Sequence, residues 1–135
     1  MNAIIMDDDR RATIKIGGQD YDLILTTKAT KEIAGRYGGL GNLSDNMMNA
    51  ENFEMAISEI VWLITLLANQ GIMIHNIRHP EDRKPLLTEE EVELLTVPYE
   101  LADYRTAITE ALHRGTQRNI KSEKSEDNEK NVSVG

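Results

Sequence analysis

The residues best suited to metal chemistry are His75 and His79, which lie four positions apart at the end of a long apolar segment. On a continuous helix this spacing would place both imidazoles on one face, where zinc would need a third and usually a fourth ligand. Glu81 and Asp82 follow closely, but Pro80 favours an end to the helix before His79, so the rings need not share a face. The alternative is a pair of histidines that interact with the dipole at a helix C-terminus. We expect no metal site.

Carboxylates are abundant but do not form an isolated catalytic pair. The run at 89–93 contains Glu89, Glu90, Glu91 and Glu93 at a predicted helix N-terminus, where negative charge is stabilised without catalysis. General acid–base chemistry needs two groups with different pKa values in a dry cleft. Glu59 stands at the start of the apolar segment, and we place it on the solvent-facing edge of that helix. No serine lies in a G-x-S-x-G elbow, so we expect no catalytic residue and no enzyme.

The glycine-rich run GGLGN at 38–42 is the only sequence that suggests a phosphate loop. Phosphate loops lie between a strand and the following helix, whereas here a predicted helix precedes the glycines. No Lys-Ser or Lys-Thr pair follows. The run is therefore interpreted as a helix cap and turn, and no cofactor is expected.

Composition limits the classes of partner. The 135 residues are enough for one domain and carry 15 Lys and Arg against 23 Asp and Glu, a net charge of −8. This charge disfavours a nucleic-acid partner and favours protein partners. Cysteine is absent, which excludes disulfides and thiolate chemistry. Aromatic residues are only 4% of the chain, so the core must be mainly aliphatic, with six methionines filling gaps.

Neither a signal peptide nor a membrane span is expected. The start of the chain has a short apolar run followed by Asp7, Asp8 and Asp9, the reverse of the charge order in a signal peptide. The most apolar segment, residues 60–74, is shorter than the roughly 20 residues that a bilayer needs, and it contains Asn69 and Gln70. We interpret it as a buried helix of a soluble protein.

Alternating apolar and polar residues predict a β-hairpin over 12–25, with strands at about 12–16 and 21–25. Ile14 and Ile16 share one face of the first strand, and Leu23 and Leu25 share one face of the second. The glycine pair at 17–18 supplies the positive φ angles of a tight turn. An isolated hairpin is marginally stable in water, so its apolar face must pack on helices.

Periodicity, caps and breakers predict helices at about 28–37, 44–49, 51–76, 89–96 and 98–114. Thr27 is the predicted N-cap of the first helix, and Gly38-Gly39 ends it. Thr88 and Glu91 match a capping box. Pro98 fits the first position of the last helix, which Gly115 ends. Residues 76–87 between the third and fourth of these helices are predicted to be a polar surface loop.

The helix at 51–76 is the predicted centre of the fold. Between Ile60 and Ala68 it is apolar nearly all round, so it is surrounded by other elements or by a second subunit in a homo-oligomer. Gly71 indicates a close contact, a kink or an early end. The predicted fold class is mainly α with a small N-terminal β-hairpin (α+β), a compact helical domain around one long apolar helix. Its domain spans 12–115, between a flexible arm at 1–11 and a polar disordered tail at 116–135.

Methionines and a phenylalanine cluster around the start of the central helix, namely Met47, Met48, Phe53 and Met55. Flexible thioethers suit a surface that accepts varied apolar partners. The alternative is that these side chains fill the core. We predict this cluster as the partner-binding site.

Four runs of the chain carry a resemblance to a known family: YDLILTTKATKEIAGRYGGLGNL, ENFEMAISEIVWLITLLANQGIMI, KPLLTEEEVELL and AITEALHRGTQRN. Over about residues 18–119 their order resembles the small tail assembly chaperones of long-tailed phages and prophages of Gram-positive bacteria. The resemblance implies a mainly helical, non-enzymatic protein that binds and solubilises the tape measure protein in the host cytoplasm. It also implies help in recruiting tail tube protein, and absence from the mature virion.

Two other classes of function stay open from the sequence. One is a structural head–tail connector or tube-associated subunit, which would remain in the virion. The other is a small acidic regulatory protein whose surface occupies a basic site of a host protein.

Overall fold

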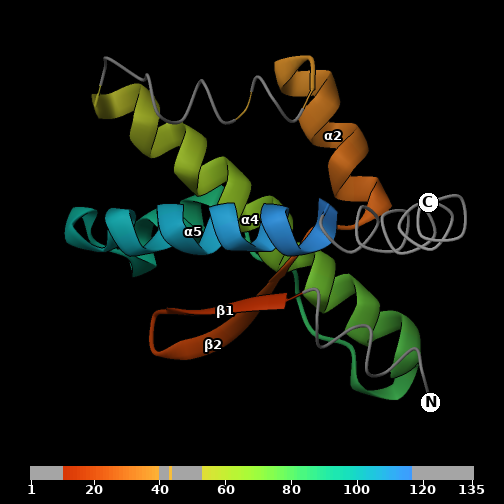
Figure 1. Cartoon of the computed structure of the whole chain (residues 1–135). Helices are drawn as coiled ribbons and strands as arrows, with labels where there is room; N and C mark the ends of the chain where they lie inside the picture. The colour runs from red at the N-terminus through yellow and green to blue at the C-terminus, as the bar shows by residue number, and fades with distance from the viewer. Residues whose placement is uncertain (1–10, 40–42, 44–52, 117–135) are drawn as a thin grey trace, which may run out of the picture.

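The computed structural model describes residues 11–39, Leu43 and 53–116, with residues 53–56 described as backbone only. It confirms the predicted fold class, mainly helical with a small N-terminal hairpin around one long apolar helix (Figure 1). The elements are β1 (Arg11–Ile16), β2 (Gln19–Ile24), α2 (Thr27–Tyr37), α4 (Phe53–Arg78), the 3-10 turn η1 (Pro80–Asp82), α5 (Glu89–Leu95), the 3-10 turn η2 (Pro98–Glu100) and a closing helix over 101–116.

The hairpin is closed by a two-residue turn. Ile16 pairs with Gln19 across it, and Gly17 and Gly18 have φ angles of 59° and 86°. Positive φ at both central positions is the requirement of a type I′ turn, which matches the strand twist. The second strand therefore begins nearer to the turn than predicted, with Gln19 and Asp20 in β2, and it ends at Ile24 instead of 25. Arg11 also pairs within β1, so the predicted arm over 1–11 was wrong at its last residue.

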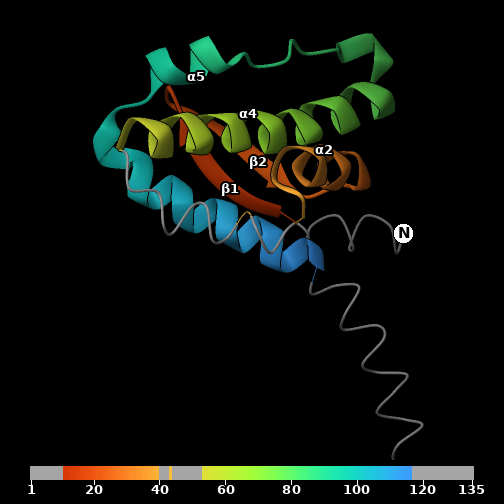
Figure 2. The same cartoon turned by 90° about the horizontal axis from the view of Figure 1, so that it is seen from above.

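The hairpin lies between two helices, as the view from above shows (Figure 2). α4 packs along β2, and the closing helix lies beside β1, where the Tyr104 hydroxyl donates to the Lys15 carbonyl at 3.1 Å and Arg114 Nη1 donates to the Arg11 carbonyl at 3.2 Å. These bonds satisfy backbone groups along the free edge of β1. Alternate β1 residues Ala12, Ile14 and Ile16 are buried in the core.

α2 begins one residue earlier than predicted. Thr26, not Thr27, is the N-cap, because its backbone is extended and its hydroxyl accepts from the Ala29 N–H at 3.0 Å. The same hydroxyl donates to the Gln70 side chain, and this second contact links the start of α2 to α4. The predicted C-cap is confirmed: Gly38 is left-handed, with a φ of 84°, and donates to the Ala34 carbonyl.

α4 runs two residues beyond its predicted end at Asn76. Its central residues Leu63, Ile64 and Leu67 are fully buried, and the predicted close contact at Gly71 is confirmed. A Cβ placed there would lie 3.1 Å from the Asp22 carbonyl oxygen of β2. By length and composition alone, Ile57–Arg78 could cross a membrane, although 44% of its most apolar part is buried within the chain.

The connection after α4 is held against the helix by two asparagine side chains. Asn69 donates to the Leu87 carbonyl at 2.9 Å and accepts from the Leu87 N–H at 2.8 Å. Asn76 makes the same two bonds with Lys84, at 2.9 and 2.8 Å. Because Asn76 and Leu87 are themselves buried, the predicted surface loop over 76–87 was wrong at both ends. We call residues 84–87 the strap.

The last two helical segments follow the predicted caps but not all the predicted limits. The capping box of α5 is confirmed, with Thr88 Oγ1 accepting from the Glu91 N–H at 3.1 Å and a Glu91 oxygen accepting from the Thr88 N–H at 2.9 Å. Pro98 begins the separate turn η2 rather than the closing helix. Gly115 does not end that helix, which includes Thr116, so the predicted tail over 116–135 was wrong at its first residue. The glycine instead allows a close approach, since a Cβ at Gly115 would lie 2.8 Å from Leu25 Cβ.

Candidate protein-binding surface

The predicted methionine cluster falls largely outside the described residues. Met47 and Met48 lie there, as does the predicted helix at 44–49. Phe53 and Met55 belong to the first turn of α4, with only their backbone described. The cluster therefore stays a prediction, and the surfaces considered next come from other parts of the chain.

α4 ends at Arg78, before His79, as predicted from Pro80, yet the two histidine rings lie close together. Their ring centroids lie 4.8 Å apart, because α4 continues to Arg78 and His79 N–H still bonds the His75 carbonyl. His75 Nε2 lies 2.8 Å from the Asp82 carbonyl oxygen, so this nitrogen carries its proton and is used within the fold. Among the described residues no group of three or more His, Asp or Glu side chains could hold a metal ion.

Glu59 lies at the border of the buried face of α4 and is not simply solvated. Its carboxylate accepts from Arg36 Nε at 3.1 Å and from the Tyr37 hydroxyl, with its side chain 24% exposed. The Arg36 guanidinium lies over the Trp62 ring at 4.3 Å from its centroid, and the Tyr37 and Trp62 rings meet edge-on. Burial and the Glu59 carboxylate raise the pKa of Tyr37. This cluster fastens α2 to α4 and presents no reactive pair.

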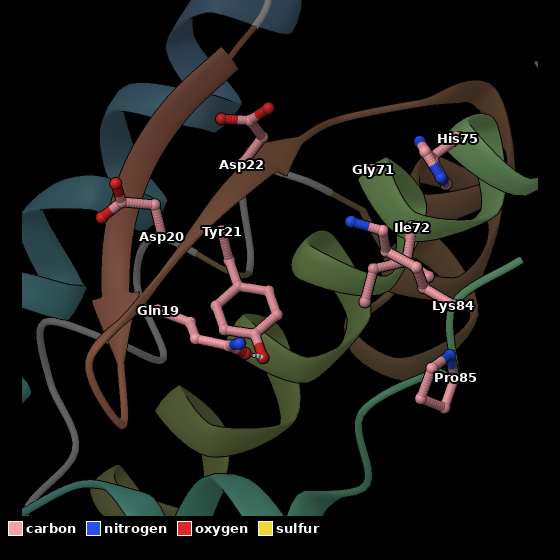
Figure 3. Close-up of a pocket in the computed structure, with 9 residues that line it drawn as sticks. All are labelled: Gln19, Asp20, Tyr21, Asp22, Gly71, Ile72, His75, Lys84 and Pro85. Carbon is pink, nitrogen blue, oxygen red and sulfur yellow. Dashed lines mark hydrogen bonds between the residues drawn. The ribbon is translucent and has the colours of Figure 1, made fainter. Parts of the chain in front are cut away.

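A groove of about 600 Å³ lies between β2, α4 and the strap (Figure 3). Tyr21 and Ile72 supply apolar walls, and Lys84 and Pro85 come from the strap. The Tyr21 hydroxyl donates to Gln19 at 2.9 Å. The acidic residues at its rim are paired within the hairpin, since Asp20 bonds Lys15 and Asp22 bonds Arg11, each at 3.1 Å. The acidic side chains of the groove are therefore paired, whereas the Lys84 ammonium group has no ion-pair partner among the described residues.

Large apolar side chains are exposed where the chain passes from α5 to the closing helix. We call this surface the α5 apolar patch; its residues and exposed fractions are Leu94 at 77%, Leu95 at 48%, Val97 at 53% and Tyr99 at 89%. The patch is fixed to the hairpin turn, because Leu95 Cδ2 would lie 3.2 Å from a Cβ at Gly17. Exposed large apolar residues that lie this close together along the chain are candidates for a protein-interaction surface.

Carboxylate side chains precede and follow the α5 apolar patch along the chain. Glu89, Glu90, Glu91 and Glu93 precede it on α5, and Glu100 and Asp103 follow it; all are at least partly exposed. Glu90 and Glu91 lie one helical turn before Leu94, on the same side of α5. These six carboxylates flank the patch along the chain, and we call them its acidic rim.

The exposure of Leu94 could have been predicted from the short length of α5 and the spacing of its apolar residues. Of the apolar residues Val92, Leu94 and Leu95 of α5, only Val92 is buried. A helix of seven residues can direct only one narrow stripe to the core, and Leu94 is rotated about 200° from Val92. Leu94 therefore could not share the buried side of α5 with Val92.

Comparison with protein-family models, with curated proteins and with solved structures finds no match to this chain.

Proposed function

We propose that this chain is a phage tail assembly chaperone, which binds and solubilises the tape measure protein and helps to recruit tail tube protein. The proposal rests on the resemblance described above and on the α5 apolar patch. The fold is mainly helical, which agrees with the mainly helical protein that the resemblance implies.

The α5 apolar patch is the observation that carries the proposal. A long helical partner with an apolar stripe aggregates in water unless another surface covers the stripe. Leu94 and Tyr99, with most of their surface exposed, are suited to pack on such a stripe. The net charge of −8 would keep the resulting complex soluble.

The other parts of the proposal follow from this role. A protein that acts by covering apolar surface needs no catalytic residue, so the proposed activity is binding without an enzymatic step. We place the protein in the host bacterial cytoplasm during tail assembly, outside the mature virion.

Co-expression with the candidate tape measure protein tests the proposal. We expect the tape measure protein to be soluble only when this chain is present, and to become insoluble with the double variant Leu94→Ser/Tyr99→Ser. Ile77→Ser is the matched control, because Ile77 is 79% exposed and lies at the end of α4, away from the patch. Equal solubility with all variants would contradict a role for the patch.

Two further measurements separate the alternatives. Mass spectrometry of purified particles would detect a head–tail connector and is expected to find no copy of a chaperone. The methionine hypothesis is tested by Met47→Asp and Phe53→Asp: if these variants are folded and still hold the tape measure protein in solution, that cluster is not the binding site.

A further inference from the structure

The carboxylates around the α5 apolar patch are concentrated and uncompensated. Residues 85–104 contain six acidic residues and no Lys, Arg or His. Elsewhere acidic side chains meet basic ones within the fold, as in Arg11–Asp22, Lys28–Glu32 and Arg114–Glu110. None of the six rim carboxylates has a basic partner within ion-pair distance among residues 11–39, 43 and 53–116.

Part of this charge has a structural role, and part does not. Glu91 and Glu100 each accept a backbone N–H, from Thr88 and Val97 respectively. Glu90 and Glu93 are exposed and make no hydrogen bond or ion pair within the described chain. Repulsion between neighbouring carboxylates on a short helix is unfavourable, and a cationic partner would relieve it.

From this complementarity we infer that the α5 apolar patch binds a cationic amphipathic helix, with leucine-like side chains on the patch and Lys or Arg side chains on the acidic rim. The inference rests on the protein-binding role proposed above and specifies the chemistry of the partner. A second copy of this chain is a poor occupant, since each copy carries a charge of −8 and would bring the same acidic rim to the contact.

A helix suits the surface better than an extended strand. Strand addition needs a free sheet edge, and the part of the hairpin nearest the patch is its turn, at Gly17. A helix instead presents apolar residues every three or four positions, with basic residues at the borders of the stripe. Lys and Arg can pack their methylene stems beside the apolar contact while their charged ends reach the carboxylates.

Synthetic peptides test the inference independently of any phage protein. The probe is a fluorescent peptide of about 18 residues, five helical turns, with a leucine stripe flanked by lysines. A matched peptide carries glutamates in place of the lysines. Fluorescence anisotropy with the full-length protein, at about 50 and 500 mM salt, measures binding under weak and strong screening.

We expect the lysine peptide to bind about tenfold or more tightly than the glutamate peptide at low salt, and to lose most of this preference at high salt. Leu94→Ser/Tyr99→Ser should weaken binding about tenfold, as truncation of anchor residues does. Glu90→Lys/Glu93→Lys should abolish the preference for lysine. The controls Ile77→Ser and Glu81→Lys, an exposed site on η1, should leave both affinities unchanged.

Three results would overturn the inference. If both peptides bind equally and both lose affinity in Leu94→Ser/Tyr99→Ser, the patch is a binding site without a preference for a cationic partner. Binding of the lysine peptide that is insensitive to the Leu94/Tyr99 variant would indicate general attraction to an acidic protein. Self-association in sedimentation, lost on Leu94→Ser/Tyr99→Ser, would assign the patch to a second copy. Failure of tape measure solubilisation alone, with peptide binding intact, would reject the phage role and keep the inference.

Discussion

At the residue scale, two elements pack closely against their neighbours at positions where glycine has no side chain. The closing helix reaches Leu25 at Gly115, and α4 reaches the β2 backbone at Gly71. Both glycines lie inside helices, where glycine is less favourable than alanine by roughly 0.5–1 kcal/mol. Their presence is explained by the space that the neighbouring element occupies.

Gly115→Ala is expected to destabilise the protein, because its Cβ would lie 2.8 Å from Leu25 Cβ and 2.9 Å from Leu25 Cδ2. We expect the free energy of unfolding to fall by about 1–3 kcal/mol, as for other overpacked contacts. Gly35→Ala is the control: nothing lies within 4 Å of its Cβ position in α2. It should raise the free energy of unfolding by about 0.5–1 kcal/mol. Urea denaturation measures both, and equal effects would contradict the packing argument.

At the element scale, the two hydrogen-bonded positions on the strap are separated by about the same distance as their two partners on α4. Asn69 and Asn76 lie seven residues apart on α4, about 10.5 Å along a helix axis. Their partners Leu87 and Lys84 are three residues apart on an extended segment, about 10 Å. The two bidentate amide contacts therefore hold the strap antiparallel to α4, and they set where α5 and its apolar patch begin.

The two asparagines should contribute unequally. Asn69→Ala leaves both backbone groups of buried Leu87 without partners, so we expect a loss of about 1–3 kcal/mol in the free energy of unfolding. Asn76→Ala leaves the groups of exposed Lys84 to water, and its loss should be below about 1 kcal/mol. Hydrogen exchange at the Leu87 amide should accelerate in the first variant only. Equal acceleration in both would show that the contacts act as one unit.

The attachment of the closing helix to the hairpin is expected to weaken at alkaline pH. Burial, together with the Glu100 carboxylate, raises the pKa of Tyr104 from its ordinary value of 10.0 to about 12. A raised pKa means that the folded state favours the neutral phenol. This stabilisation is complete below about pH 10 and is lost as the pH rises towards about 12.

Tyr104→Phe removes this dependence along with the bond to the Lys15 carbonyl. The variant should be less stable by about 1 kcal/mol at neutral pH. Above pH 10 its free energy of unfolding should fall less steeply than that of the wild type, so the two curves converge. Tyr99→Phe, at a side chain 89% exposed, is the control and should follow the wild type. Parallel alkaline curves for wild type and Tyr104→Phe would reject the assignment.

At the scale of the whole molecule, α4 is enclosed from several sides by elements distant in sequence. The hairpin and closing helix lie on one side of it and α5 with the strap on the other (Figure 2). The closing helix contributes Leu101, Tyr104, Ile108 and Ala111 to the common core. The hairpin therefore depends on both helices, because two strands alone are marginally stable.

Truncation tests this dependence. A chain ending after Glu100 should lose cooperative thermal unfolding, since the core residues of the closing helix are removed. A chain ending after Thr116 should melt within about 2–4 °C of the full chain, a shift that corresponds to at most about 1 kcal/mol. This second expectation rests on the polar composition of residues 117–135. Circular dichroism measures both. Cooperative melting of the shorter chain would show that the core does not depend on the closing helix.

Several features of the candidate surface could be predicted from local sequence, and others could not. The capping box at Thr88 and Glu91 is a local signal, and it correctly located the start of α5. The exposure of Leu94 was missed, since helical periodicity in a short helix does not show which stripe faces the core. The role of Asn69 and Asn76 was also missed, because their partners are 18 and 8 residues away.

The sequence by itself determined the elements: alternation and the glycine pair define the hairpin, caps and periodicity define the helices, and composition defines an acidic, cysteine-free chain. These properties depend on neighbours within a few residues, so they are readable along the chain. Only the tertiary structure decided that Gly115 is a packing contact, that the strap is fixed to α4, and that Leu94 and Tyr99 are exposed. Each of these depends on which distant element occupies the adjacent space, and that is a property of the assembled core.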